Sequence, residues 1–324
     1  MNLDQRNDDQ PIRSEELPVV GGPSEDLSDL SADDDFEETS SSKWTLPVSL
    51  FVATVFTTLW AGAYQAYNGP IHGPVNFLLE HPETLWRGIP FAATLLGILV
   101  THECGHYVLS RIHRVPASLP LFIPGPPHFI GTFGAIIRLR GPILNRRALF
   151  DIGVAGPLAG FVVAVVALVI GLNLSTVVDR TATYGLQLGE PLLLQFISWL
   201  VVGSLPPQAD IVLHPIGFAA WFGLFVTSLN LIPIGQLDGG HVAYALLGSR
   251  QRTMAFAMVP LLIVLGFVGW PGWLLWAFMA GLWGFGHPPV RDPHASLGRG
   301  RIVVGWIALA VFVLTFAPIP FSFH

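Results

Sequence analysis

The chain has 324 residues, of which 52% are hydrophobic and only 12% are charged, and its mean hydropathy is +0.57. Soluble domains carry roughly 25% charged residues, so this composition excludes an ordinary soluble protein and indicates a chain that lies in a lipid bilayer. The net charge of −6 comes mainly from one region, because 13 of the 22 acidic residues lie within residues 1–43.

The first region, residues 1–43, mixes acidic runs with serine and threonine. Such a composition cannot bury enough apolar surface to fold, so we predict a disordered acidic tail, with a docking arm for a basic partner as the alternative. The start of the chain lacks a basic segment followed by an apolar one, so no cleavable signal peptide is expected. Residues 44–324 are predicted to form one polytopic transmembrane domain.

Long apolar stretches follow the tail, and several reach the roughly 20 residues that a spanning helix needs. We therefore predict an all-α polytopic membrane protein with about six to seven transmembrane helices. The fifth and sixth stretches flank a tight turn and are predicted as two short spans, with one re-entrant hairpin as the alternative. The seven stretches are 46–67, 89–111, 149–172, 214–234, 254–268, 270–286 and 302–318.

The arginines predict the orientation, because basic residues in short loops stay on the cytoplasmic side. Six arginines lie between the second and third stretches, at 111, 114, 138, 140, 146 and 147. That loop, the active-site side and the tail are therefore expected in the cytoplasm, with the chain in a plasma or inner membrane. The later arginines also lie in cytoplasmic loops only if the apolar segment from Pro191 to Leu205 does not cross the membrane. Asp179 and Gln208 are then predicted to lie on the same outer side.

The second stretch ends in an H-E-x-x-H pattern formed by His102, Glu103 and His106. Positions four apart share one face of a helix, so the two imidazoles can bind one metal ion with Glu103 beside them. Ionisable groups inside a bilayer are costly unless paired or metal-bound. The pattern predicts one Zn²⁺ per chain; the alternative is a set of hydrogen-bonded core residues in a channel or transporter.

A catalytic zinc site needs three protein ligands, and the second stretch supplies two. We predict Asp238 as the third, because it follows the fourth stretch just after Pro233 and Gly235 interrupt the helix. His241 is an alternative ligand or a donor that supports the ligands. Asp151, at the mouth of the third stretch, is expected to be solvated or to cap a helix.

Together, H-E-x-G-H on one span and N-x-x-P-x-x-x-x-D-G-G-H on a later one resemble the site-2 protease family of intramembrane zinc metalloproteases. The resemblance runs from about Phe91 to His241, so the catalytic core is expected at about 89–241. It implies that His102, His106 and Asp238 bind zinc, that Glu103 activates water, and that Asn230 touches substrate near the metal.

One branch of that family, bacterial and chloroplast-like, also has a pattern similar to Gly286, His287, Pro288 and Pro289. The segment between His113 and Phe150 is too short for the PDZ domain that some members carry. We therefore expect a member of the PDZ-less branch.

A glycine-bounded segment from Gly131 to Gly141 shows partial alternation and predicts a short membrane-associated β-strand or hairpin. An exposed strand edge can hold an unwound peptide, so Gly134 and Ile136 are predicted to contact substrate. An ordinary cytoplasmic loop strand is the alternative. Gly153, Gly156 and Gly160 in the third stretch are expected to allow close helix packing.

The function implied is hydrolysis of peptide bonds in or near transmembrane segments of membrane-protein substrates. Glu103 would take a proton from water and pass it to the leaving amine. Cys104 lies about 100° away from Glu103 around the helix, so it is expected to pack and not to attack substrate. Transmembrane proteins and the bilayer are the expected partners, and no nucleic acid is expected. A secondary transporter and a proteolytically inactive membrane adaptor are the alternatives.

Overall fold

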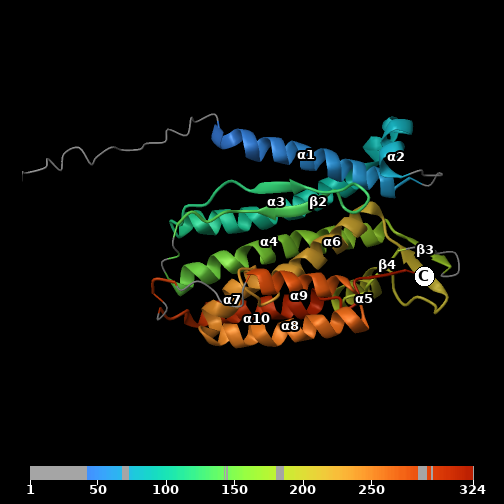
Figure 1. The fold of residues 1–324 in the computed structure, drawn as a ribbon. Helices are drawn as coiled ribbons and strands as arrows, with labels where there is room; N and C mark the ends of the chain where they lie inside the picture. The colour runs from blue at the N-terminus through green and yellow to red at the C-terminus, as the bar shows by residue number, and fades with distance from the viewer. Residues whose placement is uncertain are drawn as a thin grey trace, which may run out of the picture. The chain divides into compact units, whose positions relative to one another are not determined.

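The computed structural model describes residues 42–67, 73–141, 143, 145–179, 186–283, 290–292 and 295–323. The tail predicted at 1–43 lies almost wholly outside the described residues, and so does the Gly286–Pro289 motif. The described part is mostly helical, with three small antiparallel sheets (Figure 1). The helices are α1 Ser42–Gln65, α2 Pro74–Glu80, η2 Pro82–Gly88, α3 Ile89–Ile112, α4 Arg146–Asn173, α5 Leu192–Val201, α6 Pro215–Asn230, α7 Asp238–Leu247, α8 Arg250–Val268, α9 Gly272–Trp283 and α10 Gly298–Thr315.

Each of the seven apolar stretches contains a helix, namely α1, α3, α4, α6, α8, α9 and α10. Among the described residues, five segments are long and apolar enough to cross a membrane, which makes the chain a multi-pass membrane protein. The helices α6 and α9, with 16 and 12 residues, are apolar but shorter than the roughly 20 residues of a typical span. The five segments are Trp44–Gln65, Pro82–Ile112, Arg146–Asn173, Arg250–Val268 and Gly298–Thr315.

At the centre of the described fold, α4 packs against α3, α6, α7 and α10 (Figure 1). Glycines allow the close approach of these helices. A Cβ on Gly105 of α3 would lie 2.6 Å from the Ala155 carbonyl of α4, and a Cβ on Gly171 would lie 2.2 Å from the Gly217 nitrogen of α6. Backbone-to-backbone packing of this kind is typical of helices in a bilayer.

The segment between α3 and α4 forms an antiparallel hairpin of β1, Leu121–Pro124, and β2, Thr132–Ile136. The loop of this hairpin lies along α1. The Thr57 hydroxyl donates to the Gly131 carbonyl at 2.6 Å, and the Gln65 amide donates to the Phe129 carbonyl at 2.6 Å. Thr57 and Gln65 are about 12 Å apart along the helix axis, so the hairpin loop follows the half of α1 that ends at Gln65.

At the opposite end from the α3–α4 connection, β3, Thr176–Asp179, pairs with β5, Ala209–Val212. Asp179 pairs with Ala209, so Asp179 and Gln208 lie close together, as two residues on the same side of a membrane can. Between these strands α5 has 10 residues, about 15 Å, which is half the thickness of a hydrocarbon core. The Pro191 to Leu205 segment therefore does not contain a spanning helix.

The third small sheet pairs β4, Leu186–Leu188, with β6, Phe321–Phe323. The ring of Phe321 is buried and lies within aromatic contact distance of Trp221, Phe222 and Phe225 on α6. The last strand of the chain is thus packed against the helix that leads toward Asp238.

Candidate metal centre

The two histidines of the H-E-x-x-H pattern lie on one face of α3. His102 and Glu103 are 5% and 6% exposed, and the Nε2 atoms of His102 and His106 are 3.1 Å apart. Positions four apart in an α-helix are neighbours, so the helix alone brings the two imidazoles together. Glu103 lies close enough to His102, His106 and Asp238 to interact with all three electrostatically.

Asp238 reaches the two histidines from the start of α7. Its Oδ2 atom lies 3.3 Å from Nε2 of His102 and 3.3 Å from Nε2 of His106. The chain leaves α6 at Asn230 and turns sharply through Gly235, which has φ +54°. The carboxylate occupies the first turn of α7, where the helix dipole favours a negative charge.

The glycine pair after Asp238 permits this turn. A Cβ on Gly239 would lie 2.0 Å from the Leu231 carbonyl oxygen, and a Cβ on Gly240 would lie 2.4 Å from the Gly235 carbonyl oxygen. Any larger residue at either position would push the first turn of α7 away from the preceding loop. The backbone of the preceding loop therefore lies in close contact with the first turn of α7.

These three donors form a group that could hold a metal ion, with all ligand atoms within 4.8 Å of one another. Two ligands at about 2.0–2.1 Å from a tetrahedral zinc are about 3.3 Å apart, which matches the separations of 3.1, 3.3 and 3.3 Å. Two imidazoles and one carboxylate leave a fourth position open, as catalytic zinc sites do. The residues therefore fit zinc in number, chemistry and spacing.

The other ring nitrogen of His106 is held by α4. Nδ1 lies 2.7 Å from the Ile152 carbonyl oxygen and donates to it, which leaves the Nε2 lone pair free to face the metal position. The ring fits against α4 only because residue 156 is glycine, since a Cβ there would lie 2.1 Å from Nε2. Gly160 lies similarly against His102, where a Cβ would be 3.2 Å from the His102 Cβ.

The remaining predicted site residues lie at different distances from this group. The Asn230 amide nitrogen is 3.4 Å from Nε2 of His102, so Asn230 borders the three donors. His241 lies one turn after Asp238 and packs against α4, where a Cβ on Gly153 would be 2.8 Å from the His241 Cβ. The three-donor group contains Asp238 and does not contain His241. Cys104, which was expected to pack, is exposed in the structure.

The strand residues lie on the hairpin beside α3 (Figure 1). Gly134 has φ +100° and pairs with Ile123 of β1, and Ile136 pairs with Leu121 and is 52% exposed. In the described part of the chain β2 pairs with β1 alone, so its other edge is not covered by a strand. Phe133 on the same strand is 69% exposed.

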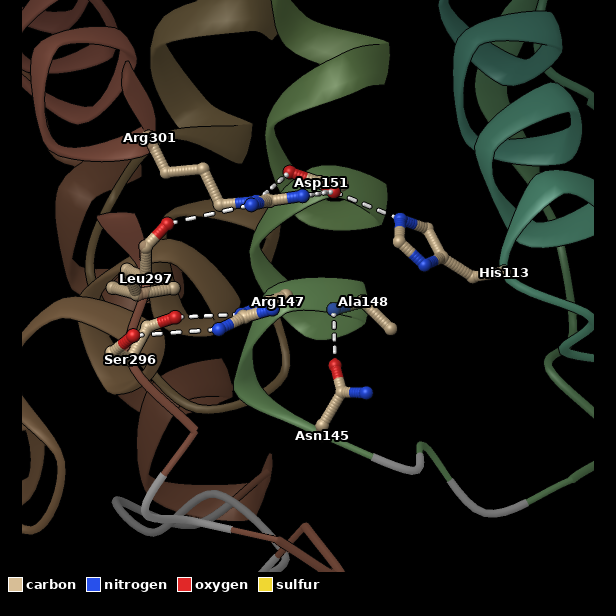
Figure 2. Close-up of polar contacts among 8 residues, drawn as sticks. All are labelled: His113, Asn145, Arg147, Ala148, Asp151, Ser296, Leu297 and Arg301. Atoms are coloured by element: carbon tan, nitrogen blue, oxygen red, sulfur yellow. Dashed lines mark hydrogen bonds and ion pairs between the residues drawn. The ribbon is translucent and has the colours of Figure 1, made fainter. Parts of the chain in front are cut away.

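Asp151 lies outside the metal group and binds two other side chains (Figure 2). Nε and Nη2 of Arg301 donate to its two oxygens, both at 2.7 Å, and Nε2 of His113 lies 2.8 Å from Oδ2. The carboxylate is 18% exposed. The expectation of a solvated or capping residue is therefore wrong; Asn145 caps α4 instead, accepting from the Ala148 nitrogen at 2.9 Å.

Sequence reasoning missed several residues that shape this centre. Arg146 donates to the Ala245 carbonyl at 2.9 Å and so holds the end of α7, the helix that begins with Asp238. The Ile152 carbonyl orients His106. Every residue has a backbone carbonyl, so the sequence does not indicate which one makes this contact. The repeated spacing of small residues pointed to Gly156 as a helix-packing position. It did not show that the ring of His106 lies against this glycine.

Comparison with known proteins places this sequence in a family. The family model described as Peptidase family M50 matches residues 90–268, more than half of the chain, and this range includes His102, His106 and Asp238. The chain is 31% identical over 237 residues to "Probable zinc metalloprotease EGY1, chloroplastic" of Arabidopsis thaliana, covering 71% of this chain and 43% of that protein. It is 33% identical over 181 residues to "Probable zinc metalloprotease EGY2, chloroplastic" of the same plant, covering 54% and 31%.

A rice relative extends the match. The chain is 27% identical over 298 residues to "Probable zinc metalloprotease EGY2, chloroplastic" of Oryza sativa subsp. japonica, covering 89% of this chain and 52% of that protein. The chain thus spans about half or less of the length of these curated relatives. No solved structure matches. The family match and the resemblance to site-2 proteases agree, and the chain belongs to Peptidase family M50.

Proposed function

We propose that this protein is an intramembrane zinc metalloprotease that hydrolyses peptide bonds in or near transmembrane segments of other membrane proteins. The observation that carries the proposal is the group of His102, His106 and Asp238, because three metal-ligand atoms converge beside a buried glutamate within apolar helices. One zinc ion per chain is the cofactor, as the names of the relatives suggest.

Zinc in such a site supplies a lowered water pKa, toward about 7, and polarisation of the substrate carbonyl. Glu103 is the residue that handles the proton: it accepts one from the attacking water and returns it to the leaving amine. Its burial and its position beside both imidazoles and Asp238 support this role. No side chain needs to form a covalent bond with substrate.

Two neighbouring residues have supporting roles in this proposal. Asn230 borders the donors at 3.4 Å from His102 and offers an amide to the substrate backbone near the reacting carbonyl. His241 packs against α4 at Gly153 and keeps the first turn of α7, with Asp238, in place. His241 then acts on the metal only through Asp238.

The substrate is proposed to bind as an extended strand on the open edge of β2. A helical transmembrane segment has no free backbone groups, so it must unwind before its peptide bonds can be cut. An uncovered strand edge offers the backbone hydrogen bonds that the unwound segment needs. This strand has no side chain at Gly134, and the exposed side chains of Phe133 and Ile136 provide apolar contacts.

We infer a cytoplasmic active site in the plasma or inner membrane. The arginine-rich connection between α3 and α4 lies at the end of α3 that carries His106, and basic loops stay in the cytoplasm. The later arginines would also lie in cytoplasmic loops if the membrane is crossed by α1, α3, α4, α6, α8, α9 and α10. The acidic segment 1–43 would then also be cytoplasmic, and 89–241 would be the catalytic core of the domain at 44–324.

The decisive experiment measures zinc content and cleavage together on the purified full chain in detergent or liposomes. Wild type should hold one zinc per chain and cleave a transmembrane substrate. Glu103→Gln keeps the side-chain size but cannot accept a proton, so it should keep zinc and lose several orders of magnitude in cleavage rate.

Each alternative gives a different result in the same experiment. Zinc without any cleavage by wild type would favour an inactive adaptor, and no zinc together with ion-coupled transport would favour a transporter. Loss of zinc in Glu103→Gln would show that Glu103 is structural.

A further inference from the structure

Three helices meet at the carboxylate of Asp151, one turn into α4 (Figure 2). Arg301 on α10 contacts both carboxylate oxygens at 2.7 Å, and His113, the residue after α3, contacts Oδ2 at 2.8 Å. A guanidinium that pairs with both oxygens fixes the plane of the carboxylate. The Asp151–Arg301 pair therefore sets the direction in which Oδ2 faces His113.

This junction is directly connected to the metal centre through the backbone. The residue after Asp151 is Ile152, whose carbonyl accepts the Nδ1 proton of His106 at 2.7 Å. His106 and His113 lie on the same helix or at its end, seven residues and about 10 Å apart. Two adjacent residues of α4 therefore hold α3 at two points, and a slide of α3 along α4 would break both contacts.

The contribution of α10 lies outside the part of the chain that the family model matches. The match ends at residue 268, whereas Arg301 lies in the first turn of α10, Gly298–Thr315. The side chains of Asp151, His113 and Arg301 are 18%, 22% and 33% exposed, so the junction is only partly buried. Its loss should weaken local alignment without unfolding the helices.

We propose that Asp151 is a positioning residue for the metal centre. Held by Arg301, it keeps α3 in register with α4 through His113, so that the Ile152 carbonyl stays on Nδ1 of His106 and Nε2 keeps facing the metal position. The proposal rests on the proposed function, because it assumes that His102, His106 and Asp238 hold zinc. It adds that the C-terminal helix α10 contributes to the affinity for that zinc.

A second contact, with the segment just before α10, provides the matched control. Arg147, one turn before Asp151, donates to the Ser296 carbonyl at 2.6 Å and to its hydroxyl at 3.3 Å (Figure 2). Arg147 thus anchors the segment before α10 to α4 without contacting α3 in any bond that the structure shows. Arg299, which is exposed in the first turn of α10, controls for a change of charge beside Arg301.

The test measures the rate at which the zinc-loaded full chain in detergent releases zinc to an excess of chelator. Asp151→Asn and Arg301→Gln should each release zinc at least 10-fold faster, the scale expected when a partner that orients a ligand is lost. The double variant should be no faster than Asp151→Asn alone, because Arg301 acts on α3 only through Asp151. Arg147→Gln and Arg299→Gln should stay within about twofold of wild type.

If Asp151→Asn does not fold, His113→Ala tests the same proposal. It leaves the Asp151–Arg301 pair intact and removes only the link to α3, so release should again be about 10-fold faster. Wild-type release in His113→Ala or in a folded Asp151→Asn would overturn the proposal, and so would an equal acceleration in Arg147→Gln. A wild-type protein that binds no zinc would instead contradict the proposed function.

Discussion

Asp151 and Asp238 are both partly buried carboxylates that accept contacts from histidine, but their surroundings differ. Asp151 is paired with Arg301, whose guanidinium stays charged at any physiological pH. The ion pairs of Asp238, in the part of the chain that the structure describes, are with the imidazoles of His102 and His106. A cation held by these three side chains would balance the buried charge of Asp238, as Arg301 balances that of Asp151.

The comparison separates a carboxylate that pairs with arginine from one that is placed to bind a metal ion. A carboxylate matched by arginine at 2.7 Å is already satisfied, and removing it loosens a junction. A carboxylate oxygen that lies 3.3 Å from two imidazole Nε2 atoms has the spacing expected of a zinc ligand. Substitutions of Asp151 and of Asp238 should therefore have different effects on zinc binding and cleavage.

The largest effect is expected for Asp238→Asn, which keeps the side-chain shape but removes the charge. A neutral amide is a poor zinc ligand, so zinc affinity should fall by more than about 100-fold and cleavage should be lost. Zinc content after dialysis and cleavage of a transmembrane substrate measure the two effects. His241→Ala is the matched control and should cost roughly 10-fold to 100-fold. Zinc retained in Asp238→Asn but lost in His241→Ala would assign the third ligand to the imidazole.

A second prediction concerns the glycine that makes room for His106. Gly156→Ala places a Cβ 2.1 Å from Nε2, so the ring must move by about 1 Å or more, and displacements of that size cost about 100-fold in rate. Cleavage and zinc affinity should both decline. Gly97→Ala on α3, where a Cβ would meet nothing within 4 Å, is the control and should leave both unchanged. Full activity in Gly156→Ala would mean that α4 does not constrain the ring.

The smallest expected effect tests the strand edge, away from both carboxylates. Ile136→Pro deletes one backbone donor of β2 and resists an extended ladder, so cleavage of a transmembrane substrate should fall about 10-fold with zinc retained. Ile136→Val keeps the donor and the β-branched shape and should behave as wild type. Unchanged turnover in Ile136→Pro would show that β2 does not hold the substrate.

Much of the helical framework and the three metal donors could be predicted from the sequence. Apolar runs of about 20 residues have few alternatives to a spanning helix. The H-E-x-x-H spacing places two imidazoles on one helix face, and the ligand count then requires a third donor at a depth that only a few acids share. Asp238 lies 132 residues after His106 in the sequence, and the fold brings its carboxylate to 3.3 Å from both imidazoles.

The remaining features depend on packing that the sequence does not express. Arg301 reaches Asp151 across 150 residues, and no spacing rule connects them. The Ile152 carbonyl is a backbone group, so its contact with His106 is independent of the side chain at 152. The strand β2 was expected within Gly131 to Gly141, but its partner β1 and the course of the hairpin along α1 follow from tertiary contacts such as Thr57 with Gly131.

Cys104, the single cysteine of the chain, is exposed and lies next to Glu103 on α3. The native sequence therefore carries one attachment point for a thiol-reactive spin label or fluorophore, on the helix that holds two of the three metal donors. Because Cys104 is two residues from His102 and from His106, about 200° around the helix, a probe there faces away from these two donors. Movement of the metal helix during zinc loading or substrate entry can be followed spectroscopically without first removing other cysteines.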